Sequence, residues 1–490
     1  MLSSLKSTGK AAVILPHGVL FRGGAEGVIR KQILQQGYIH SIIGLPPNLF
    51  FGTGIPACII ILDKAGSAGR KGVFLIDASK GFIKDGSKNR LREQDIHKIV
   101  DACKQQRELP KFSRLVALAE IDSNDFNLNI PRYIDTSAAE DLHDIDAHLH
   151  GGIPERDLDA LQAYWDVMPN LRSALFTPQR PGYLQLKIPL AEIKPSIFAH
   201  PEFRAFNQTI NGLFEAWRNE HRPSLRNIAI GDRPKALLHT LAEDLLQRFK
   251  TAPLVDAYDV YQHLQDYWYT TLQDDLYQLV IDGWQSIVAS GAYKGAANLD
   301  LLPPDLVVRA HYRKEADAIA ELEAKRDAIS RELEELSEEQ GGEEGLLAEG
   351  KTDKGKLTAA SVKARLKAIT HDQGANDERH ALKQCLALIE RESEASKRVK
   401  AAQKSLDAKV LARYVQLNED DLKTLVVDHK WLATLEADVQ TELDRVSRTL
   451  TGRIRQLAER YASPLPTLNA EVEALSAKVN THLAKMGFAV

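Results

Sequence analysis

Short apolar runs alternate with amphipathic stretches over the first 135 residues. Residues 27–38 carry apolar side chains at helical spacing, and Gly37 supplies a stop signal for a helix. Three runs have the length and content of strands, and the last of them is continuous and β-branched: residues 11–16, 39–46 and 57–64. This order of strand, helix, strand and strand predicts an α/β sheet.

The predicted sheet continues through residues 72–79 and closes around residues 127–136. The connection of residues 65–71 is short and contains glycine, which is typical of a hairpin between the third and fourth strands. Residues 92–110 predict a helix that turns these side chains inward: Ile96, Ile99, Val100 and Cys103. Because residues 11–16 read as an internal strand with no unit before it, we expect a partial sheet and a truncated start.

The pattern becomes helical and aromatic between about residues 155 and 312. One predicted helix face carries aromatic and leucine side chains at steps of three and four: Tyr258, Tyr261, Leu264, Trp268 and Leu272. Such a stripe is more often the core of a helical domain than a platform for stacked bases, so the sequence favours a helical core here.

Residues 313–339 follow a heptad repeat. One heptad position holds Ile319, Arg326 and Leu333, and the other holds Leu322, Ile329 and Leu336. This spacing predicts a coiled-coil helix. Residues 341–356 combine Gly, Glu and Lys with almost nothing to bury, which indicates a mobile connection. The charged stretch of residues 358–412 would then return antiparallel along the first helix.

The last segment is helical as well, with helices expected at residues 422–435, 437–461 and 468–485. The predicted fold class is therefore α/β followed by mostly α: a partial Rossmann-like sheet, a helical domain and a coiled-coil or helical C-terminal region. We place the four segments at residues 1–140, 151–312, 313–412 and 413–490.

Composition narrows the functional classes. The 490 residues include 63 Lys and Arg against 67 Asp and Glu, for a formal net charge of −4. This balance argues against a protein that coats nucleic acid through bulk charge, so any contact with DNA has to be local.

Cysteine use and hydropathy point to a cytoplasmic protein without membrane partners. Cys58, Cys103 and Cys385 lie far apart, so neither a disulfide framework nor a structural zinc site is indicated, and a reducing cytoplasm fits. The apolar run of residues 11–15 is too short for a signal peptide. A bilayer span needs roughly 18 or more consecutive apolar residues, and the chain has no such run.

Several stretches carry a resemblance to a known family. The most informative is Gly44 to Lys64, GLPPNLFFGTGIPACIIILDK, preceded by Leu15 to Lys31, LPHGVLFRGGAEGVIRK. Together they resemble the second half of the catalytic domain in the modification subunit of type I restriction-modification systems, which are adenine-N6 DNA methyltransferases. Residues 124–136 resemble the segment that closes that domain. The C-terminal extension of one branch of the family is similar to residues 151–165, 424–432 and 482–488.

The resemblance implies S-adenosylmethionine as cofactor of the intact subunit, but two family motifs are missing. A glycine-rich turn holds that cofactor in the family, and an Asn-Pro-Pro-aromatic loop accepts from the adenine amino group. Here the two Pro-Pro pairs follow Leu45 and Leu302, and neither is followed by an aromatic residue. Leucine offers no acceptor, so we expect no complete catalytic set and no cofactor binding by this chain alone.

The aromatic pair Phe50 and Phe51 is the candidate substrate site. A DNA methyltransferase flips its target base and holds it between flat apolar surfaces. The family's aromatic in this motif is similar in position to Phe50, which we therefore expect to stack on the flipped adenine, with Phe51 as the alternative. Packing of one or both side chains under the sheet is the competing interpretation.

Neighbouring residues are candidates for contact with DNA or with another subunit. Gly52, Thr53 and Gly54 resemble part of a dinucleotide fingerprint, but they run into a strand rather than a helix, so a tight turn near DNA is favoured over phosphate binding. Arg22 and Arg30 flank a loop between a strand and a helix, where open α/β sheets place ligands. A solvated charge is the alternative for Arg30.

The densest cluster of histidine and aspartate consists of Asp141, His143, Asp144, Asp146, His148 and His150. These residue types bind metals, yet no fixed ligand spacing is present, so a polar interdomain linker is favoured and no metal site is predicted.

Two functions remain, and they are compatible. The chain is expected to supply part of the modification subunit, with half of the base pocket, or to act as an assembly scaffold through its helices. The resemblance implies DNA, a specificity subunit, a second modification subunit and a restriction subunit as partners. An independent DNA-binding role is disfavoured by the near-neutral charge.

Overall fold

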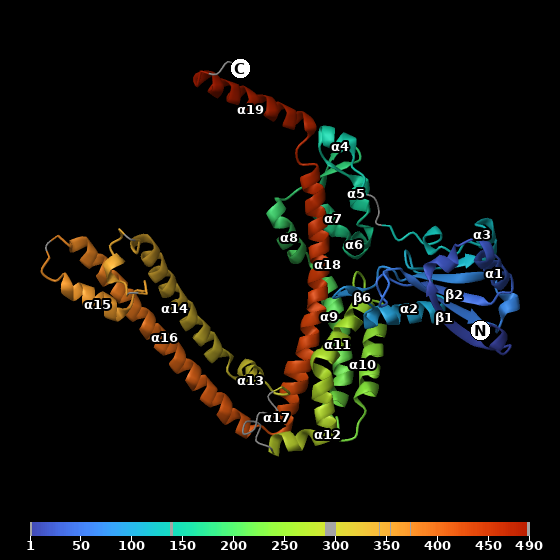
Figure 1. Cartoon of the computed structure of the whole chain (residues 1–490), viewed down its shortest axis with the longest axis horizontal. Helices are drawn as coiled ribbons and strands as arrows, with labels where there is room; N and C mark the ends of the chain where they lie inside the picture. Colours follow the sequence, from blue (N-terminus) through green and yellow to red (C-terminus); the bar gives the residue numbers. More distant parts are fainter. Residues whose placement is uncertain are drawn as a thin grey trace. The chain divides into compact units, whose positions relative to one another are not determined.

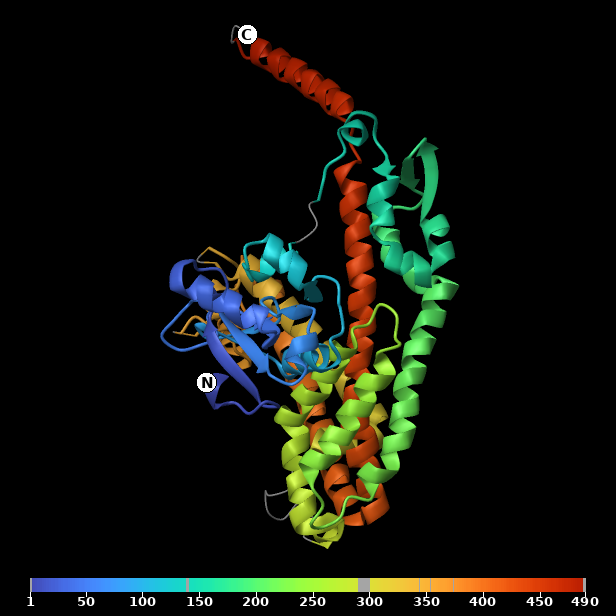
Figure 2. The same ribbon diagram turned by 90° about the vertical axis from the view of Figure 1, so that its right-hand side faces the viewer.

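The computed structural model describes residues 2–137, 141–289, 300–342, 344–352, 354–372 and 374–487. The chain divides into two compact units (Figures 1 and 2). The first comprises residues up to 220, residues 235–270 and residues from 435 onward, and the second comprises residues 221–234 and 271–434. The predicted domain end at residue 140 and Phe488 of the last family motif lie outside the described residues.

A mixed sheet of five strands forms the N-terminal part of the first unit, in the order β1-β3-β2-β4-β7. The strands are β1 (Lys10–Pro16), β2 (Ile39–Gly44), β3 (Ala57–Asp63), β4 (Gly72–Asp77) and β7 (Ser113–Ala117). β3 is antiparallel to both β1 and β2, while β2 and β4 are parallel. This sheet, followed by mostly helical segments, confirms the predicted fold class.

Helices cover both faces of the sheet, which explains why its central strands are mostly apolar. On one face α1 (Gly24–Gln35) places Leu34 in a core with Ile42 and Cys58. On the other face α2 (Glu93–Gln105) places Ile99 in a core with Phe74 and other buried residues. Alternate residues of β3 and β4 thus face one core or the other.

The predicted hairpin between the third and fourth strands is wrong. β2 lies between β3 and β4, so the connection of residues 65–71 crosses the end of β2. Gly37, with φ +67°, makes room for this crossing, because a Cβ there would collide with the Ser67 carbonyl. Arg70 Nη1 donates to Asp63 O at 2.9 Å and holds the connection in place. Gly37, outside the connection itself, therefore allows the close approach of the two backbones.

The predicted inward face of α2 is partly wrong. Ile99 is buried and Cys103 is half-buried, but Ile96 and Val100 are exposed. The Asp95 carboxylate accepts from the backbone N–H of Arg92 at 2.9 Å and caps the helix start. Capping by a buried Asp95 turns the stripe that contains Ile99 and Ala102 toward the sheet, and this leaves Ile96 and Val100 on the flank.

The helical part of the first unit confirms the aromatic core. All five predicted stripe residues from Tyr258 to Leu272 are buried, on α11 (Ala257–Tyr267) and the π-helical segment η6 (Trp268–Leu272). One addition was not predicted: residues 153–186 include a small sheet of β8 (Ile153–Pro154), β9 (Phe176–Arg180) and β10 (Tyr183–Leu186). Gly182, with φ +78°, forms the turn between β9 and β10.

The remaining elements of the first unit include short hairpin strands and longer helices. The bounds are β5 (Ile83–Asp85), β6 (Lys88–Arg90), α3 (Leu118–Ser123), α4 (Ile145–His150), α5 (Glu155–Asp159), α6 (Gln162–Val167), α7 (Pro169–Leu175), α8 (Ile193–Ala199), α9 (Pro201–Arg226), α10 (Pro234–Phe249), α18 (Ala433–Arg460) and α19 (Leu465–Lys485). Of these, α9, α10 and α18 extend past the limits of the unit.

The second unit contains the predicted antiparallel helix pair, α14 (Arg313–Gln340) and α16 (Asn376–Gln416). Lys409 Nζ lies 2.9 Å from Glu315 Oε1, and Ser330 contacts Glu392, which fixes the opposite directions. The other helices of this unit are α12 (Gln273–Ala289), α13 (Pro304–His311), α15 (Ala359–Ala368) and α17 (Glu419–Lys423).

Two expectations in this region are wrong. Residues 341–356 do bury a side chain: Leu347 packs against Val362 and Leu382, and its N–H donates to Gln340 O at 2.8 Å. The expected break near residue 436 is missing too, because the backbone is helical from Glu419 to Arg460 through the π-helical segment η9 (Thr424–Leu432). A wider π turn realigns the buried face without interrupting the helix.

A buried charge cluster explains the sequence of η9. Lys430 Nζ donates to Asp275 Oδ2 at 2.6 Å and to the carbonyl oxygens of Asp300 and Leu301 at 2.7 and 3.1 Å. Trp431 Nε1 donates to the same carboxylate oxygen at 2.7 Å. Each charged group therefore has its partners inside the second unit, as buried charges require.

Replacing one partner of this pair should destabilise the second unit. We expect Lys430→Met to lower the free energy of unfolding by about 3–5 kcal/mol, because Asp275 would be left buried without its cation. Chemical denaturation followed by circular dichroism measures the change. The control is Lys325→Met on the exposed side of α14, which should stay within about 0.5 kcal/mol of the unchanged chain. Equal effects of both substitutions would contradict a buried, paired role for Lys430.

Candidate functional site

Three strands of the sheet run in the same direction and end at one edge. β1, β2 and β4 end at Pro16, Gly44 and Asp77, and the loops that follow are tied together by backbone hydrogen bonds. The N–H of His17 donates to Pro56 O at 3.1 Å, and the N–H of Ala78 donates to Gly44 O at 2.9 Å. Open α/β sheets bind ligands at this carboxyl edge, which makes the loops there the candidate site.

The loop of residues 45–56, here called the aromatic loop, presents both predicted aromatic side chains to solvent. Phe51 is 93% exposed, and Phe50 is 37% exposed. The interpretation that Phe51 packs under the sheet is therefore wrong, and the Phe50 side chain is only partly covered by the protein. A large aromatic side chain with almost no protein contact is available for a ligand.

The β5–β6 hairpin holds the aromatic loop in place through hydrogen bonds to its backbone carbonyls. Lys88 Nζ donates to Phe50 O at 2.9 Å. Asn89, which is buried, donates from Nδ2 to Pro47 O at 2.7 Å and from its backbone N–H to Asn48 O at 3.0 Å. Lys88 and Asn89 were missed by the sequence analysis. Asp85-Gly86 is a strong hairpin signal and would have indicated this support.

The glycines of the aromatic loop behave as turn residues. Gly52 has φ +78°, which a side chain would strain, and Gly54 lies against Asn48 Oδ1. The Ile55 N–H donates to Thr53 Oγ1 at 3.0 Å, and the chain then enters β3 directly. This confirms a tight turn in place of a dinucleotide fingerprint, because no helix N-terminus follows the glycines.

Arg22 and Arg30 have different surroundings. The Arg22 side chain is exposed and lies 3.7 Å from Glu26. Arg30 is buried, and its guanidinium donates to the carbonyl oxygens of Phe126, Val19 and Arg22 at 2.8 to 3.0 Å. Burial lowers the pKa of Arg30. Arg30 thus ties the start of α1 to the closing segment, and its burial corrects the solvated alternative. Contact of Arg30 with DNA or another subunit stays a prediction.

His17 is a further polar group at the carboxyl edge. It is half-buried, and its Nε2 has no hydrogen-bond partner within the described residues. Burial lowers the pKa of His17, so the imidazole is neutral at pH 7. His17 was not predicted from the sequence, although open α/β sheets place ligand contacts directly after strands such as β1.

Neither Pro-Pro pair supplies the missing acceptor. Leu45 is buried in the core beneath the aromatic loop, and Asn48 follows the prolines instead of preceding them. The other pair, Pro303 and Pro304, begins α13. In the turn after β1, the Arg22 side chain lies close against Gly18. The residues present therefore do not fit S-adenosylmethionine by themselves.

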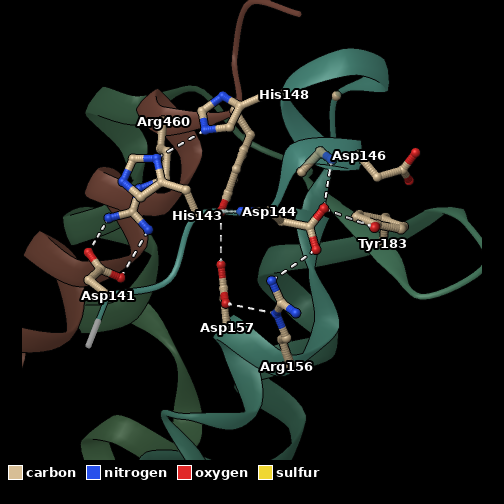
Figure 3. A network of polar contacts seen from close by, with 12 residues as sticks. Asp141, His143, Asp144, Asp146, His148, Arg156, Asp157, Tyr183 and Arg460 are labelled. Carbon is tan, nitrogen blue, oxygen red and sulfur yellow. Dashed lines mark hydrogen bonds and ion pairs between the residues drawn. The ribbon is translucent and has the colours of Figure 1, made fainter. Parts of the chain in front are cut away.

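The histidine and aspartate cluster forms an ion-pair network (Figure 3). Arg460 and Arg453 pair with Asp141 and hold the pKa of its carboxyl well below the usual range. Asp144 caps α4 by accepting from the Ala147 N–H at 2.9 Å.

The other members of the cluster are paired in the same way. Asp144 also lies 3.0 Å from Arg156, and Asp146 pairs with Arg180. His143 and His148 stack on each other. Within the described ranges no group of three or more such residues is arranged to hold a metal ion. The carboxylates are occupied by arginines, which supports the linker interpretation.

The comparisons with known proteins concern the part of the chain that carries this edge. Residues 1–142 match a family model described as N-6 DNA Methylase. This segment is therefore similar to that family. The sheet, the aromatic loop and the supporting hairpin all lie within the matched segment.

Two curated relatives are methylase subunits of type I restriction enzymes. The MjaVII subunit of Methanocaldococcus jannaschii is 41% identical over 141 residues, which cover 28% of this chain and 24% of the relative. The MpnII subunit of Mycoplasma pneumoniae is 32% identical over 170 residues, covering 34% and 31%. The chain thus spans about a quarter to a third of the length of these relatives.

A solved structure shows the same likeness. The methyltransferase subunit of a type I restriction-modification system from Streptococcus thermophilus is 49% identical, covers 27% of this chain and 28% of its own, and has a TM-score of 0.26. Together with the family model, the two relatives confirm the resemblance to type I modification subunits. Among the described helices, none is long and apolar enough to cross a membrane.

The support of the aromatic loop can be tested directly. We expect Asn89→Ala to speed hydrogen exchange of the backbone amides in residues 45–56 by roughly fivefold, because a lost hydrogen bond is worth about 1 kcal/mol. Exchange followed by mass spectrometry measures the rate. Ser87→Ala, at an exposed position of the same hairpin, is the matched control and should leave the rate unchanged. Unchanged exchange in Asn89→Ala would show that the hairpin does not hold the loop.

Proposed function

We propose that this chain is part of the DNA-modification subunit of a type I restriction-modification enzyme, in which the intact subunit methylates adenine N6 with S-adenosylmethionine. The observation that carries the proposal is the exposed aromatic loop at the carboxyl edge of the N-6 DNA methylase segment. DNA, a specificity subunit, a second modification subunit and a restriction subunit are the proposed partners, and the cytoplasm is the proposed compartment.

In this proposal the aromatic pair stacks on the flipped base. The resemblance favours Phe50, whereas exposure favours Phe51, whose ring is free of the protein. Either ring would give an extrahelical adenine a flat apolar surface, and the hairpin below would keep the loop from collapsing. The exposed guanidinium of Arg22 and the turn formed by Gly52, Thr53 and Gly54 are proposed to contact DNA or a neighbouring subunit.

The chain is proposed to be inactive alone. Methyl transfer needs a polarised amine and close alignment, and no acceptor precedes the prolines of the aromatic loop. The open edge of the sheet supports a missing partner. β1 is an edge strand with exposed Ile14, and an apolar cavity of about 250 Å³ lies between it and α1, lined by Val13, Leu15 and Ile33 among others.

Unpaired backbone groups beside an apolar cavity suit the addition of a further strand. We therefore propose that the rest of the catalytic domain packs at β1 and brings the cofactor site with it.

An assembly role is the second candidate, and the antiparallel pair α14 and α16 favours it. Long amphipathic helices offer surfaces on which other subunits dock. This role does not exclude the first one. The proposed assembly role would still stand if methylation did not require the aromatic loop.

Cofactor binding distinguishes an incomplete domain from a complete one. Isothermal titration of S-adenosylmethionine into the purified chain should give no saturable heat, because the residues at the carboxyl edge do not form the family's cofactor turn. A full-length type I methylase subunit serves as the positive control. Saturable binding at micromolar cofactor would contradict the proposal that the cofactor site lies outside this chain.

Base stacking is tested in a complex reconstituted with the N-terminal part of a type I methylase subunit and a specificity subunit. Phe50→Ala or Phe51→Ala should lower adenine methylation by roughly 5- to 150-fold, since stacking on one aromatic ring is worth about 1–3 kcal/mol. Tyr277→Ala is the control, because that aromatic ring has the same exposure as Phe50 at 37%. Size-exclusion chromatography confirms assembly of each variant. Full methylation by both Phe variants would rule out stacking by this pair.

A further inference from the structure

The C-terminal helix α19 contacts the short helix α4 but, among the described residues, buries no side chain of its own, unlike the long helices α14, α16 and α18. It runs over 21 residues from Leu465 to Lys485, the red helix before the C-terminus in Figure 1. None of its residues is buried within the described part of the chain. In contrast, the long helices α16 and α18 each bury a stripe of side chains.

The exposed side chains of α19 form a heptad seam. Apolar residues recur at alternating steps of three and four, and each of these six is 41% exposed or more: Leu465, Leu468, Val472, Leu475, Val479 and Met486. Steps of three and four keep all of them on one side of an α-helix. His482 occupies the remaining seam position, between Val479 and Met486.

Such a helix requires a partner. An isolated helix of this length is marginal in water, because most helical stability in proteins comes from packing an apolar face. A contiguous apolar stripe on a soluble protein marks an interaction surface. The other heptad stripe, on α14, is already covered by α16, so it does not need α19.

The side-chain shapes along the seam select the number of strands. Val472 and Val479 hold the a positions of the central heptads, and Leu468 and Leu475 hold the d positions. β-branched residues at a with leucine at d favour parallel, two-stranded coiled coils. A second α19 carries the matching pattern by definition, so the seam is self-complementary.

The charges beside the seam permit the same pairing. In a parallel pair each g position faces the e position five residues later in the partner. Glu471 would face Ser476 and Lys478 would face Leu483, so no like charges meet along the seam. Like charges at these positions would have opposed self-association.

We propose that α19 joins two copies of this chain in a parallel, two-stranded coiled coil, with Val472, Leu475 and Val479 at its centre. The inference goes beyond the proposed methyltransferase role and does not depend on it. Its readout is the mass of the particle, so failure of the coiled coil and failure of the aromatic loop are distinguishable.

Sedimentation equilibrium of the purified full chain tests the proposal. The unchanged chain should shift from monomer to twice the monomer mass as its concentration rises. Leu475→Glu should stay monomeric at the same concentrations, because two carboxylates would meet in the seam. Ala477→Glu, which places the same charge on the outer face two residues away, should dimerise like the unchanged chain. Circular dichroism verifies that both variants keep their fold.

Two outcomes would overturn the proposal. A chain that is monomeric at every accessible concentration would assign the seam to a helix of a different protein, and a dimer that survives Leu475→Glu would place self-association elsewhere.

The parallel direction of the two helices is tested by oxidative cross-linking. Leu475→Cys should give a covalent dimer and Ala477→Cys should not, because d positions face each other in a parallel pair. Dimers without a cross-link at residue 475 would contradict the parallel arrangement.

Discussion

The antiparallel pairing of β3 with two neighbours determines how the N-terminal part of this chain is arranged. All seven residues of β3 pair with β1, and most of them also pair with β2. Because β3 runs opposite to both, β1 and β2 end at the same edge as the parallel β4. The turn from β2 into β3 has to form at that edge, so the aromatic loop lies where open α/β sheets bind ligands. Buried Arg30 and Asn89 then fix the flanking segments through backbone carbonyls.

The sequence predicted the individual strands and helices better than it predicted which of them lie side by side. Strands and helices follow from local periodicity, and the α/β sheet, the aromatic core and the antiparallel helix pair were all anticipated in this way. Pairing depends on contacts between distant residues. The hairpin prediction failed because the backbone at Ser67 passes close to Gly37, where only a residue without a Cβ fits. The sequence of residues 65–71 alone does not reveal this contact. The burial of Leu347 was missed for the same reason, since its partners Val362 and Leu382 come later in the chain.

The candidate site shows the same division. Phe50 and Phe51 were found from a motif, but their exposure depends on a loop held away from the core by Lys88 and Asn89. Arg30 was assigned to the surface because arginine usually lies there. Its burial depends on the carbonyl of Phe126, which is 96 residues away in sequence. Residue type therefore suggested the chemistry, and only the tertiary contacts separated the exposed candidates from the structural ones.

Two surfaces of the first unit are open, and they differ in what can cover them. β1 offers a row of backbone donors and acceptors beside an apolar cavity, and another extended strand can pair with such an edge. Natural edge strands are commonly blunted by charge or proline, yet here Lys10 and Pro16 stand only at the two ends and leave Val13 to Leu15 unprotected. α19 has its backbone bonds satisfied within the helix and offers only side chains, which suit the holes of a second helix. One surface therefore selects a strand and the other a helix, so a single partner segment cannot occupy both, and completing the sheet would leave the α19 seam free for its own partner.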